Sequence, residues 1–429
     1  MTDHQTASLK SRGFIALLVT MACGAFNDNI YRGMLLVAVV AGGAWAGELG
    51  DGGTGWITTM LYAPFVILLG VAGVVADRSP KRQIIIITRF FEIGLVAGVI
   101  IAMLLGNLSL ACLMLIGLAA QSAFFSPAKY GIVPEIVGDS MLSRANGLLS
   151  LMSNTSIVAG MAVAGLLLDL GENIGIFGGV LIGIVMAIIA VISLLMSLNL
   201  PKLPAGNAEL PMSLNFVRTY WRTLRAMKGT GLLATAVAWC LFYAVASLLL
   251  LIIPNYREMF DLSAGETSYL MGIVGVGIAI GGFVAGFGSG HRIRAGLAPL
   301  GAGGIGVCAL LMGLIGTSYG TVMLLLGLTG FFGGFFVVPI LAMLQHAPEP
   351  GFRARCVGTA NFLTFLAMTV TAVAYGLLAE TSIGSAPPQW FLITASVMLL
   401  VVVWLILLMP VLRAVAASDN FGRVTDRIG

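Results

Sequence analysis

Four hydrogen-bonding residues stand close together in the first apolar run of this 429-residue chain. The stretch "CGAFNDNIYRG" (23–33) contains Asn27, Asp28, Asn29 and Arg32. If the run crosses a membrane, each charge in it costs about 2.5–3.5 kcal/mol at the centre of the bilayer. Asp28 and Arg32 are four residues apart, so they share a helical face and can form an ion pair that offsets part of this cost. Because such a pair does not explain the two asparagines, the cluster predicts a helix that lines a hydrated cavity.

The residue types in this cluster suggest two kinds of chemistry. Asp28 would bind an ammonium group of a substrate, or it would take up and release a proton as the coupling site of a transporter. Arg32 would attract a phosphate group. The structural alternative is that the four side chains only tie the first helix to its neighbours.

A second pair of opposite charges, Arg89 and Glu92, lies in the third apolar run. Their i, i+3 spacing puts both side chains on one helical face, which favours a structural ion pair. Arg89 also lies near the polar end of its run, where a long side chain can extend toward water. A gating role for the pair is the alternative. Further polar residues from later runs could line the cavity, namely Gln121, Asn154 and Tyr243.

The composition requires most of the chain to face lipid rather than water. Hydrophobic residues make up 59% of the sequence and charged residues only 9%, whereas soluble domains carry about 25% charged residues. The mean hydropathy is +1.03. Apolar runs long enough to cross a bilayer recur between short polar breaks. We predict an all-α integral membrane fold with twelve spans, at 14–40, 55–76, 83–105, 109–129, 145–168, 174–199, 231–254, 267–289, 296–316, 320–344, 356–379 and 389–412.

The positions of the lysines and arginines predict how the helices are oriented. Cationic residues gather in alternate breaks, such as 77–82 and 352–355, whereas the breaks between them hold mainly aspartate and glutamate. The positive-inside rule places the cationic breaks in the cytoplasm. With twelve spans, the tails at 1–13 and 413–429 are then both cytoplasmic.

The predicted spans divide into two halves, 14–199 and 231–412. The break between them, 200–230, contains "FVRTYWRTLRAMK" (216–228), which predicts a short amphipathic helix on the inner leaflet. A solvated linker helix without a lipid role is the alternative. Each half also has a "VP" followed later by an arginine and "ANGL" or "ANFL". Such duplication is typical of transporters that work by alternating access.

The repeated segments carry three candidate gate residues. Arg144 and Asn146 stand near the start of the fifth span, and Asn361 stands near the start of the eleventh. The two asparagines occupy matching places in the repeats, so they could hydrogen-bond across a gate between the halves. Packing between helices is the alternative role for both.

The break after the second span resembles a known family signature. It reads Gly73-Val-Val-Ala-Asp77-Arg78-Ser-Pro-Lys81-Arg82, which resembles the cytoplasmic loop signature of the major facilitator superfamily. The resemblance implies a fold of two six-helix bundles. It also implies that Asp77 lies at the start of the eleventh helix, where an acid is favoured, and latches the two halves in the outward-open state. Arg78 and Arg82 would belong to the same gate, with ordinary anchoring at the membrane surface as the alternative.

Several blocks resemble a narrower branch of that superfamily. "AFNDNIYR" in the first span, "FFSPAKYGIVPEI" after the fourth, "RANGL" before the fifth and "GGFFVVPI" in the tenth are similar to the lysophospholipid transporters. The resemblance implies inward transport of a lysophospholipid, chiefly lysophosphatidylethanolamine, across a bacterial inner membrane. It further implies reacylation by a separate acyltransferase, a monomeric protein and no cofactor.

The segment "SPAKYGIVPEI" (126–136) has its own expectation. Pro127 is predicted to end the fourth helix, which leaves Lys129 and Glu135 on an irregular segment. The resemblance makes both residues candidates for the cytoplasmic gate or for contact with a passing phosphate. The alternative is an ordinary loop with a cytoplasmic lysine.

The sequence lacks the common motifs of enzymes. It has no G-x-x-x-x-G-K-[ST] phosphate loop, which disfavours ATP-driven transport, and no H-E-x-x-H. Its five cysteines are widely spaced and indicate neither a disulfide framework nor a metal site. Because most of its cations lie in the breaks between spans, nothing indicates nucleic-acid binding.

We therefore predict a transporter, not an enzyme, that moves a lysophospholipid or another amphipathic small molecule while it contacts membrane lipids. One alternative is an ion-coupled exporter of drugs or siderophores with Asp28 as the protonation site. Another is a membrane subunit that carries an acyltransferase and transports nothing. Dependence on an ion gradient separates the first two hypotheses, and a transport assay separates the third from both.

Overall fold

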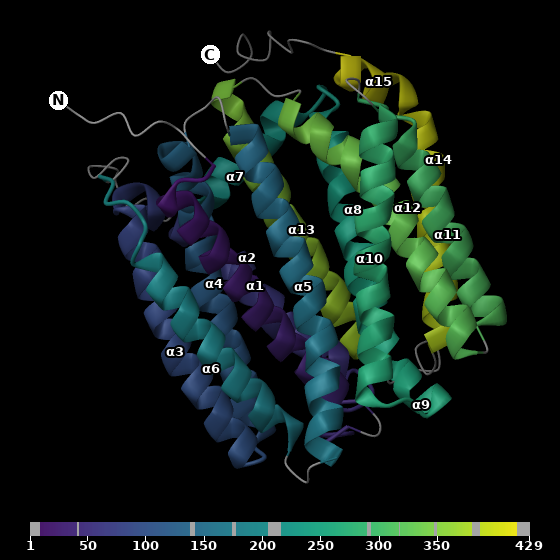
Figure 1. Cartoon of the computed structure of the whole chain (residues 1–429). Coiled ribbons are helices and arrows are strands. Elements are labelled where there is room, and N and C mark those ends of the chain that lie inside the picture. Colours follow the sequence, from purple (N-terminus) through teal and green to yellow (C-terminus); the bar gives the residue numbers. More distant parts are fainter. Residues whose placement is uncertain are drawn as a thin grey trace. The chain divides into compact units, whose positions relative to one another are not determined.

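The computed structural model is built from helices joined by short connections (Figure 1). It describes residues 9–40, 43–137, 142–173, 177–204, 216–289, 293–316, 318–346, 350–379 and 387–417. Within these ranges there is no β-strand, and twelve helices are long and apolar enough to cross a membrane. The prediction of an all-α integral membrane fold with twelve spans is confirmed.

The twelve membrane-spanning helices follow the predicted apolar runs closely. In chain order they are α1 (Arg12–Ala38), α2 (Gly53–Arg78), α3 (Lys81–Leu104), α4 (Leu108–Val137), α5 (Leu142–Asn173), α6 (Gly178–Ser197), α8 (Leu232–Ile252), α10 (Ala264–Ser289), α11 (Leu297–Ile315), α12 (Tyr319–His346), α13 (Pro350–Leu378) and α14 (Pro387–Leu407). Shorter elements lie between or after them: α7 (Phe216–Met227), the 3₁₀ turn η2 (Ile253–Asn255), α9 (Tyr256–Phe260) and α15 (Met409–Ala417).

One predicted helix end is wrong. α4 continues through Pro127 to Val137, so Lys129 and Glu135 lie on a helix and not on an irregular segment. A proline removes one backbone hydrogen bond from a helix. Membrane helices tolerate this loss where neighbouring helices pack around the proline, and Ala128, the next residue, is fully buried.

The chain forms two compact units that do not follow the sequence halves strictly. Unit 1 consists of Met1–Ala38, Met60–Leu214 and Ser263–Ser268, and unit 2 consists of Val39–Thr59, Asn215–Leu262 and Tyr269–Gly429. α2 therefore begins in unit 2 and ends in unit 1, whereas α10 begins in unit 1 and continues in unit 2.

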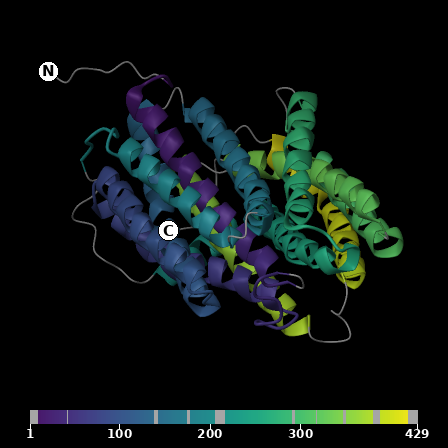
Figure 2. The same cartoon turned by 60° about the horizontal axis from the view of Figure 1, so that its bottom comes forward.

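Within unit 1, α1 packs against α5 and α6, and α3 packs against α4 and α6 (Figure 2). Close approach of α1 to α5 depends on two glycines. A Cβ at Gly33 would lie 3.1 Å from the Cβ of Ala164, and one at Gly160 would lie 2.8 Å from the backbone oxygen of Phe26. Small residues at such contacts are typical of helices that pack in lipid. This packing brings the polar residues of α1 against neighbouring helices.

Within unit 2, the short helix α7 packs on α13. The ring of Tyr220 stacks on the ring of Phe362, with centroids 4.3 Å apart, and the fully buried Met227 has its Sδ 3.9 Å from the Sγ of Cys356. The opposite face exposes Trp221 and two arginines, Arg222 and Arg225. The prediction of an amphipathic helix is confirmed here, and its contact with the inner leaflet stays a prediction.

Candidate functional site

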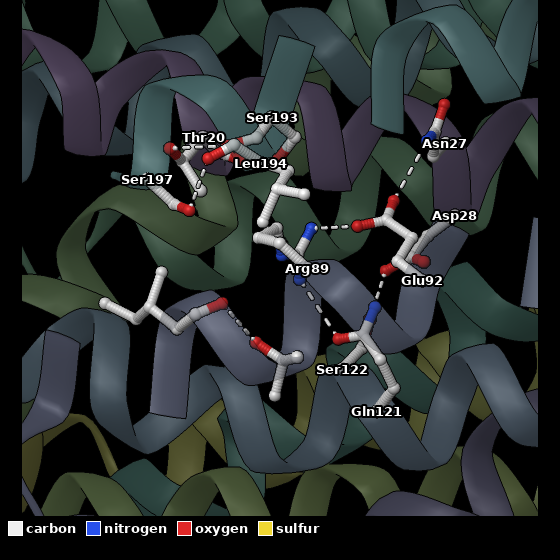
Figure 3. A network of polar contacts seen from close by, with 12 residues as sticks. Thr20, Asn27, Asp28, Arg89, Glu92, Gln121, Ser122, Ser193, Leu194 and Ser197 are labelled. Carbon is white, nitrogen blue, oxygen red and sulfur yellow. Dashed lines mark hydrogen bonds and ion pairs between the residues drawn. The ribbon is translucent and has the colours of Figure 1, made fainter. Parts of the chain in front are cut away.

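A polar network lies buried in unit 1, where α1, α3 and α4 meet (Figure 3). The Nη1 of Arg89 is 2.6 Å from the Oε2 of Glu92, and neither side chain is exposed. Arg89 also donates from Nη2 to the Oε1 of Gln121 at 3.0 Å. Glu92 accepts a second bond, from the Nδ2 of Asn27 at 2.9 Å. The ion pair predicted from the i, i+3 spacing is therefore confirmed.

The surroundings of Arg89 are shaped to hold its guanidinium group inside the protein. The guanidinium carbon lies 4.1 Å from the ring centroid of Phe125, a cation–π contact. A Cβ on Gly24 would lie 2.5 Å from the Nη1 of Arg89, so α1 can pass over the guanidinium only because residue 24 has no side chain. The expectation that Arg89 extends toward water is wrong. Its side chain is buried, and its guanidinium group forms an ion pair with Glu92 and a hydrogen bond with Gln121.

Asn27 links three helices at this point. Its Nδ2 donates to Glu92 of α3 and, at 3.2 Å, to the backbone oxygen of Met186 in α6. About two turns earlier on α1, the buried Thr20 donates to the backbone oxygen of Ser193 in α6 at 3.5 Å. These contacts give Asn27, Arg89 and Glu92 a structural role in holding α1, α3 and α6 together.

Asp28 faces a different environment from its neighbour Asn27. Its Oδ2 accepts a hydrogen bond from the Oγ of Ser122 at 2.8 Å. Asp28 and Asn29 are half-buried, whereas Asn27 is fully buried. Asn29 donates to the backbone oxygen of Ala25 in its own helix at 2.8 Å. α1 therefore presents Asp28 on its less buried side, with a neutral hydroxyl as its hydrogen-bond donor.

Arg32 does not pair with Asp28. Arg89 pairs with Glu92 and Lys81 pairs with Glu135. Asp28 turns to Ser122 of α4, whereas the guanidinium carbon of Arg32 lies 5.3 Å from the ring centroid of Tyr62 in α2. Only 6% of Arg32 is exposed, and its Nε and Nη2 are buried with no hydrogen-bond partner among the described residues. The i, i+4 spacing allows an ion pair between Asp28 and Arg32, but each side chain instead contacts a residue of another helix.

The candidates on α4 have other partners. The Nζ of Lys129 lies 4.9 Å from the ring centroid of Tyr130 and 5.5 Å from that of Phe125. Glu135 forms an ion pair with the buried Lys81 at the start of α3, with 2.5 Å between Oε1 and Nζ. Neither residue contacts the network around Arg89 by a described hydrogen bond or ion pair.

The structure describes the side chains of only some of the predicted gate residues. Arg82 donates from Nε to the backbone oxygen of Leu200 at 2.8 Å and from Nη2 to that of Leu198 at 3.0 Å, which satisfies carbonyls at the end of α6. Arg78, the last residue of α2, is half-buried. Three candidates belong to described helices but their side chains lie outside the described part, so the proposed latch stays a prediction: Asp77, Arg144 and Asn146.

The remaining candidates lie at separate places on the helices. Asn154 of α5 and Asn361 of α13 are exposed. Tyr243 of α8 is half-buried, and its ring packs edge-on against the ring of Trp239 with centroids 4.8 Å apart. Among the described residues, no group of three or more His, Cys, Asp or Glu could hold a metal ion.

Sequence reasoning missed two side chains next to the cluster. Ser122 bonds Asp28, and Tyr62 packs on Arg32. Ser122 directly follows Gln121, which the sequence analysis did single out. Gln121 bonds Arg89 in the buried network, whereas the next residue, Ser122, bonds Asp28 (Figure 3). No local spacing rule points to Tyr62, because its contact depends on how α2 packs.

The chain matches known proteins along most of its length. A family model described as Major Facilitator Superfamily matches residues 13–316. Lysophospholipid transporter LplT of Cronobacter sakazakii (strain ATCC BAA-894) is 29% identical over 376 residues, which cover 84% of this chain and 86% of that protein. The protein of the same name from Serratia proteamaculans (strain 568) is 28% identical over 79% of this chain and 81% of that protein.

Solved structures share the fold at low sequence identity. A POT family transporter in complex with a thioalcohol conjugated peptide has a TM-score of 0.73 at 14% identity, over 94% of this chain and 96% of that chain. A bacterial homolog of the human lysosomal transporter Spinster, in an inward-facing and unoccupied conformation, has a TM-score of 0.65 at 14% identity, over 95% of this chain and 97% of that chain.

Proposed function

Because the chain belongs to the major facilitator superfamily, we propose that it is a transporter of lysophospholipids in a bacterial inner membrane. The names of its relatives support the substrate class, and the twelve candidate spans support a multi-pass membrane protein. The transporter moves the lipid inward by alternating access of two six-helix bundles, with both termini in the cytoplasm. A separate acyltransferase then restores the missing acyl chain.

The environment of Asp28 is the observation that carries this proposal. A carboxylate inside a membrane span is costly unless it is paired. Glu92 is paired with Arg89, whereas Asp28 has only the neutral hydroxyl of Ser122 as a donor among the described residues. Asp28 also lies on the less buried side of α1. Arg89 and Lys129 are close enough to act on Asp28 electrostatically, but Arg89 pairs with Glu92 instead. The ammonium group of lysophosphatidylethanolamine would supply a cation that pairs with the Asp28 carboxylate directly.

A transport assay in liposomes tests the proposal. Purified protein is reconstituted, and labelled lysophosphatidylethanolamine is followed from the outer to the inner leaflet without an imposed ion gradient. We expect transport by the wild type and its loss in Asp28→Asn. The same substitution at the exposed Asp51, in the turn before α2, is the matched control and should leave transport intact.

The assay also addresses the exporter hypothesis. If the wild type does not move the lipid but passes a cationic dye only under a proton gradient, the lysophospholipid proposal is wrong. Asp28 would then be the candidate proton carrier of an ion-coupled exporter, since its position inside a span suits a proton site as well.

A further inference from the structure

The buried charge of Arg32 has no counter-charge from the described part of the protein. Among the described residues of unit 1, the other two buried cations are each paired, Arg89 with Glu92 and Lys81 with Glu135. Arg32 is 6% exposed and has the ring of Tyr62 beside it. A buried cation that lacks a counter-ion is expensive, and inside a membrane span such a residue is a mark of function.

The two buried donors of Arg32 that bond to no described residue are Nε and Nη2. These two N–H groups point to the same side of the planar guanidinium, and together they form the fork that binds two oxygens of one phosphate or carboxylate. Arg89, by contrast, uses its Nη1 and Nη2 on Glu92 and Gln121. Among the described residues, neither donor of the Arg32 fork has an acceptor, whereas the Nη2 of the Arg89 fork bonds Gln121 and its Nη1 faces Glu92.

Asp28 and Arg32 stand one helical turn apart on α1, which corresponds to about 6 Å along the helix axis. They carry opposite charges, and each turns to a neutral group of another helix, Ser122 or Tyr62, and not to the other charge. A ligand with an ammonium group and a phosphate group joined by a short spacer complements both charges at once. Ethanolamine phosphate has this form.

We propose that Arg32 is the phosphate subsite of this transporter, and that Asp28 and Arg32 together select a zwitterionic headgroup of the phosphoethanolamine type. This inference rests on the proposed function and adds to it a second contact, between Arg32 and the phosphate of the headgroup. The ammonium group binds the Asp28 carboxylate, and two phosphate oxygens accept hydrogen bonds from the Nε and Nη2 of Arg32. Lys129 is the rival cation, but it is half-exposed and already lies over the rings of Tyr130 and Phe125.

Binding of three amphiphiles to protein in nanodiscs tests the inference. Lysophosphatidylethanolamine carries both charges, lysophosphatidylglycerol carries the phosphate alone, and dodecylamine carries the ammonium alone. The dissociation constant of each is measured for the wild type, Arg32→Gln and Asp28→Asn. Arg222→Gln, an exposed arginine on α7, is the matched control for the first substitution and Asp51→Asn for the second.

We expect the two variants to fail on different ligands. Arg32→Gln should weaken both phosphate-bearing lipids by about 10- to 100-fold, the range for losing a hydrogen bond to a charged group, and should leave dodecylamine unchanged. Asp28→Asn should weaken lysophosphatidylethanolamine and dodecylamine but spare lysophosphatidylglycerol. Arg32→Lys keeps the charge without the fork and should fall between wild type and Arg32→Gln.

Several outcomes would overturn the inference. One is equal binding of all three ligands by wild type and Arg32→Gln, and another is loss of phosphate-lipid binding in Lys129→Gln with Arg32→Gln unaffected. Displacement of the lipid by inorganic phosphate alone at matched concentration would show a simple anion site. In each case the wild type still binds lysophosphatidylethanolamine, so only the inference fails, whereas a wild type that binds none of the lysolipids contradicts the proposed function itself.

Discussion

The buried ion pair between Arg89 and Glu92 makes a quantitative prediction about stability. Both side chains are fully buried, and the two charged atoms are 2.6 Å apart. If Arg89 is replaced by methionine, Glu92 keeps only the hydrogen bond from Asn27 and remains as a buried charge. Removing one partner of a buried pair costs about 3–5 kcal/mol. Glu92→Leu should cost a similar amount, because Arg89 then keeps only Gln121 and the ring of Phe125.

The double variant Arg89→Met/Glu92→Leu should cost much less than the sum of the two single variants. It leaves no unpaired charge behind, and apolar replacements of a buried pair are often close to neutral. We expect a coupling free energy of at least about 3 kcal/mol, at or above the upper end for residues in one network. The unpaired donor of Asn27 and the acceptor of Gln121 keep the double variant below wild type.

Reversible unfolding in mixed micelles measures these free energies of unfolding for wild type, both single variants and the double variant. The reasoning is refuted if either single variant loses less than about 1 kcal/mol, which is the range of exposed pairs. It is also refuted if the double variant loses the full sum, since independent residues show additive effects.

Three further predictions concern other contacts of the structure. Gly24→Ala should lower the free energy of unfolding by about 1–3 kcal/mol, because its Cβ would lie 2.5 Å from the Nη1 of Arg89; an unchanged thermal midpoint contradicts this contact. Arg32→Gln should raise the thermal midpoint in the absence of lipid, because it removes a buried cation without a counter-charge. A midpoint that falls as it does for Arg89→Met would show that Arg32 is paired. Tyr220→Leu should free α7 from Phe362 at a cost of about 0.5–1.5 kcal/mol beyond the lost area, and protease cleavage within α7 should become faster; equal cleavage rates speak against the stack.

The sequence predicts the positions of the helices better than it predicts which helices and side chains contact each other. Run lengths and hydropathy are sufficient for the twelve spans, because a bilayer fixes how long an apolar helix must be. The pair of Arg89 and Glu92 also follows from sequence, since both partners stand on one helix and their spacing is a local property. α4 was expected to end at Pro127 because a proline breaks an isolated helix, and helix packing around it decides otherwise.

The spacing of residues within one helix does not predict which residues of other helices they contact. The same rule that predicted one ion pair correctly also allowed Asp28 to pair with Arg32, which it does not do. Asp28 takes a partner from α4, 94 positions away, and no periodicity in α1 indicates that choice. The contact between Gly24 and Arg89 could not be predicted either, because nothing in the sequence distinguishes Gly24 from the other glycines among the 56 in the chain.

The most direct test of the proposed function is the movement of labelled lysophosphatidylethanolamine between leaflets of protein-containing liposomes, with wild type, Asp28→Asn and Asp51→Asn side by side. Transport by wild type and Asp51→Asn without an imposed gradient, together with its loss in Asp28→Asn, is the predicted result. Lipid movement that is the same in all three proteins, or that is no faster than in protein-free liposomes, would contradict it.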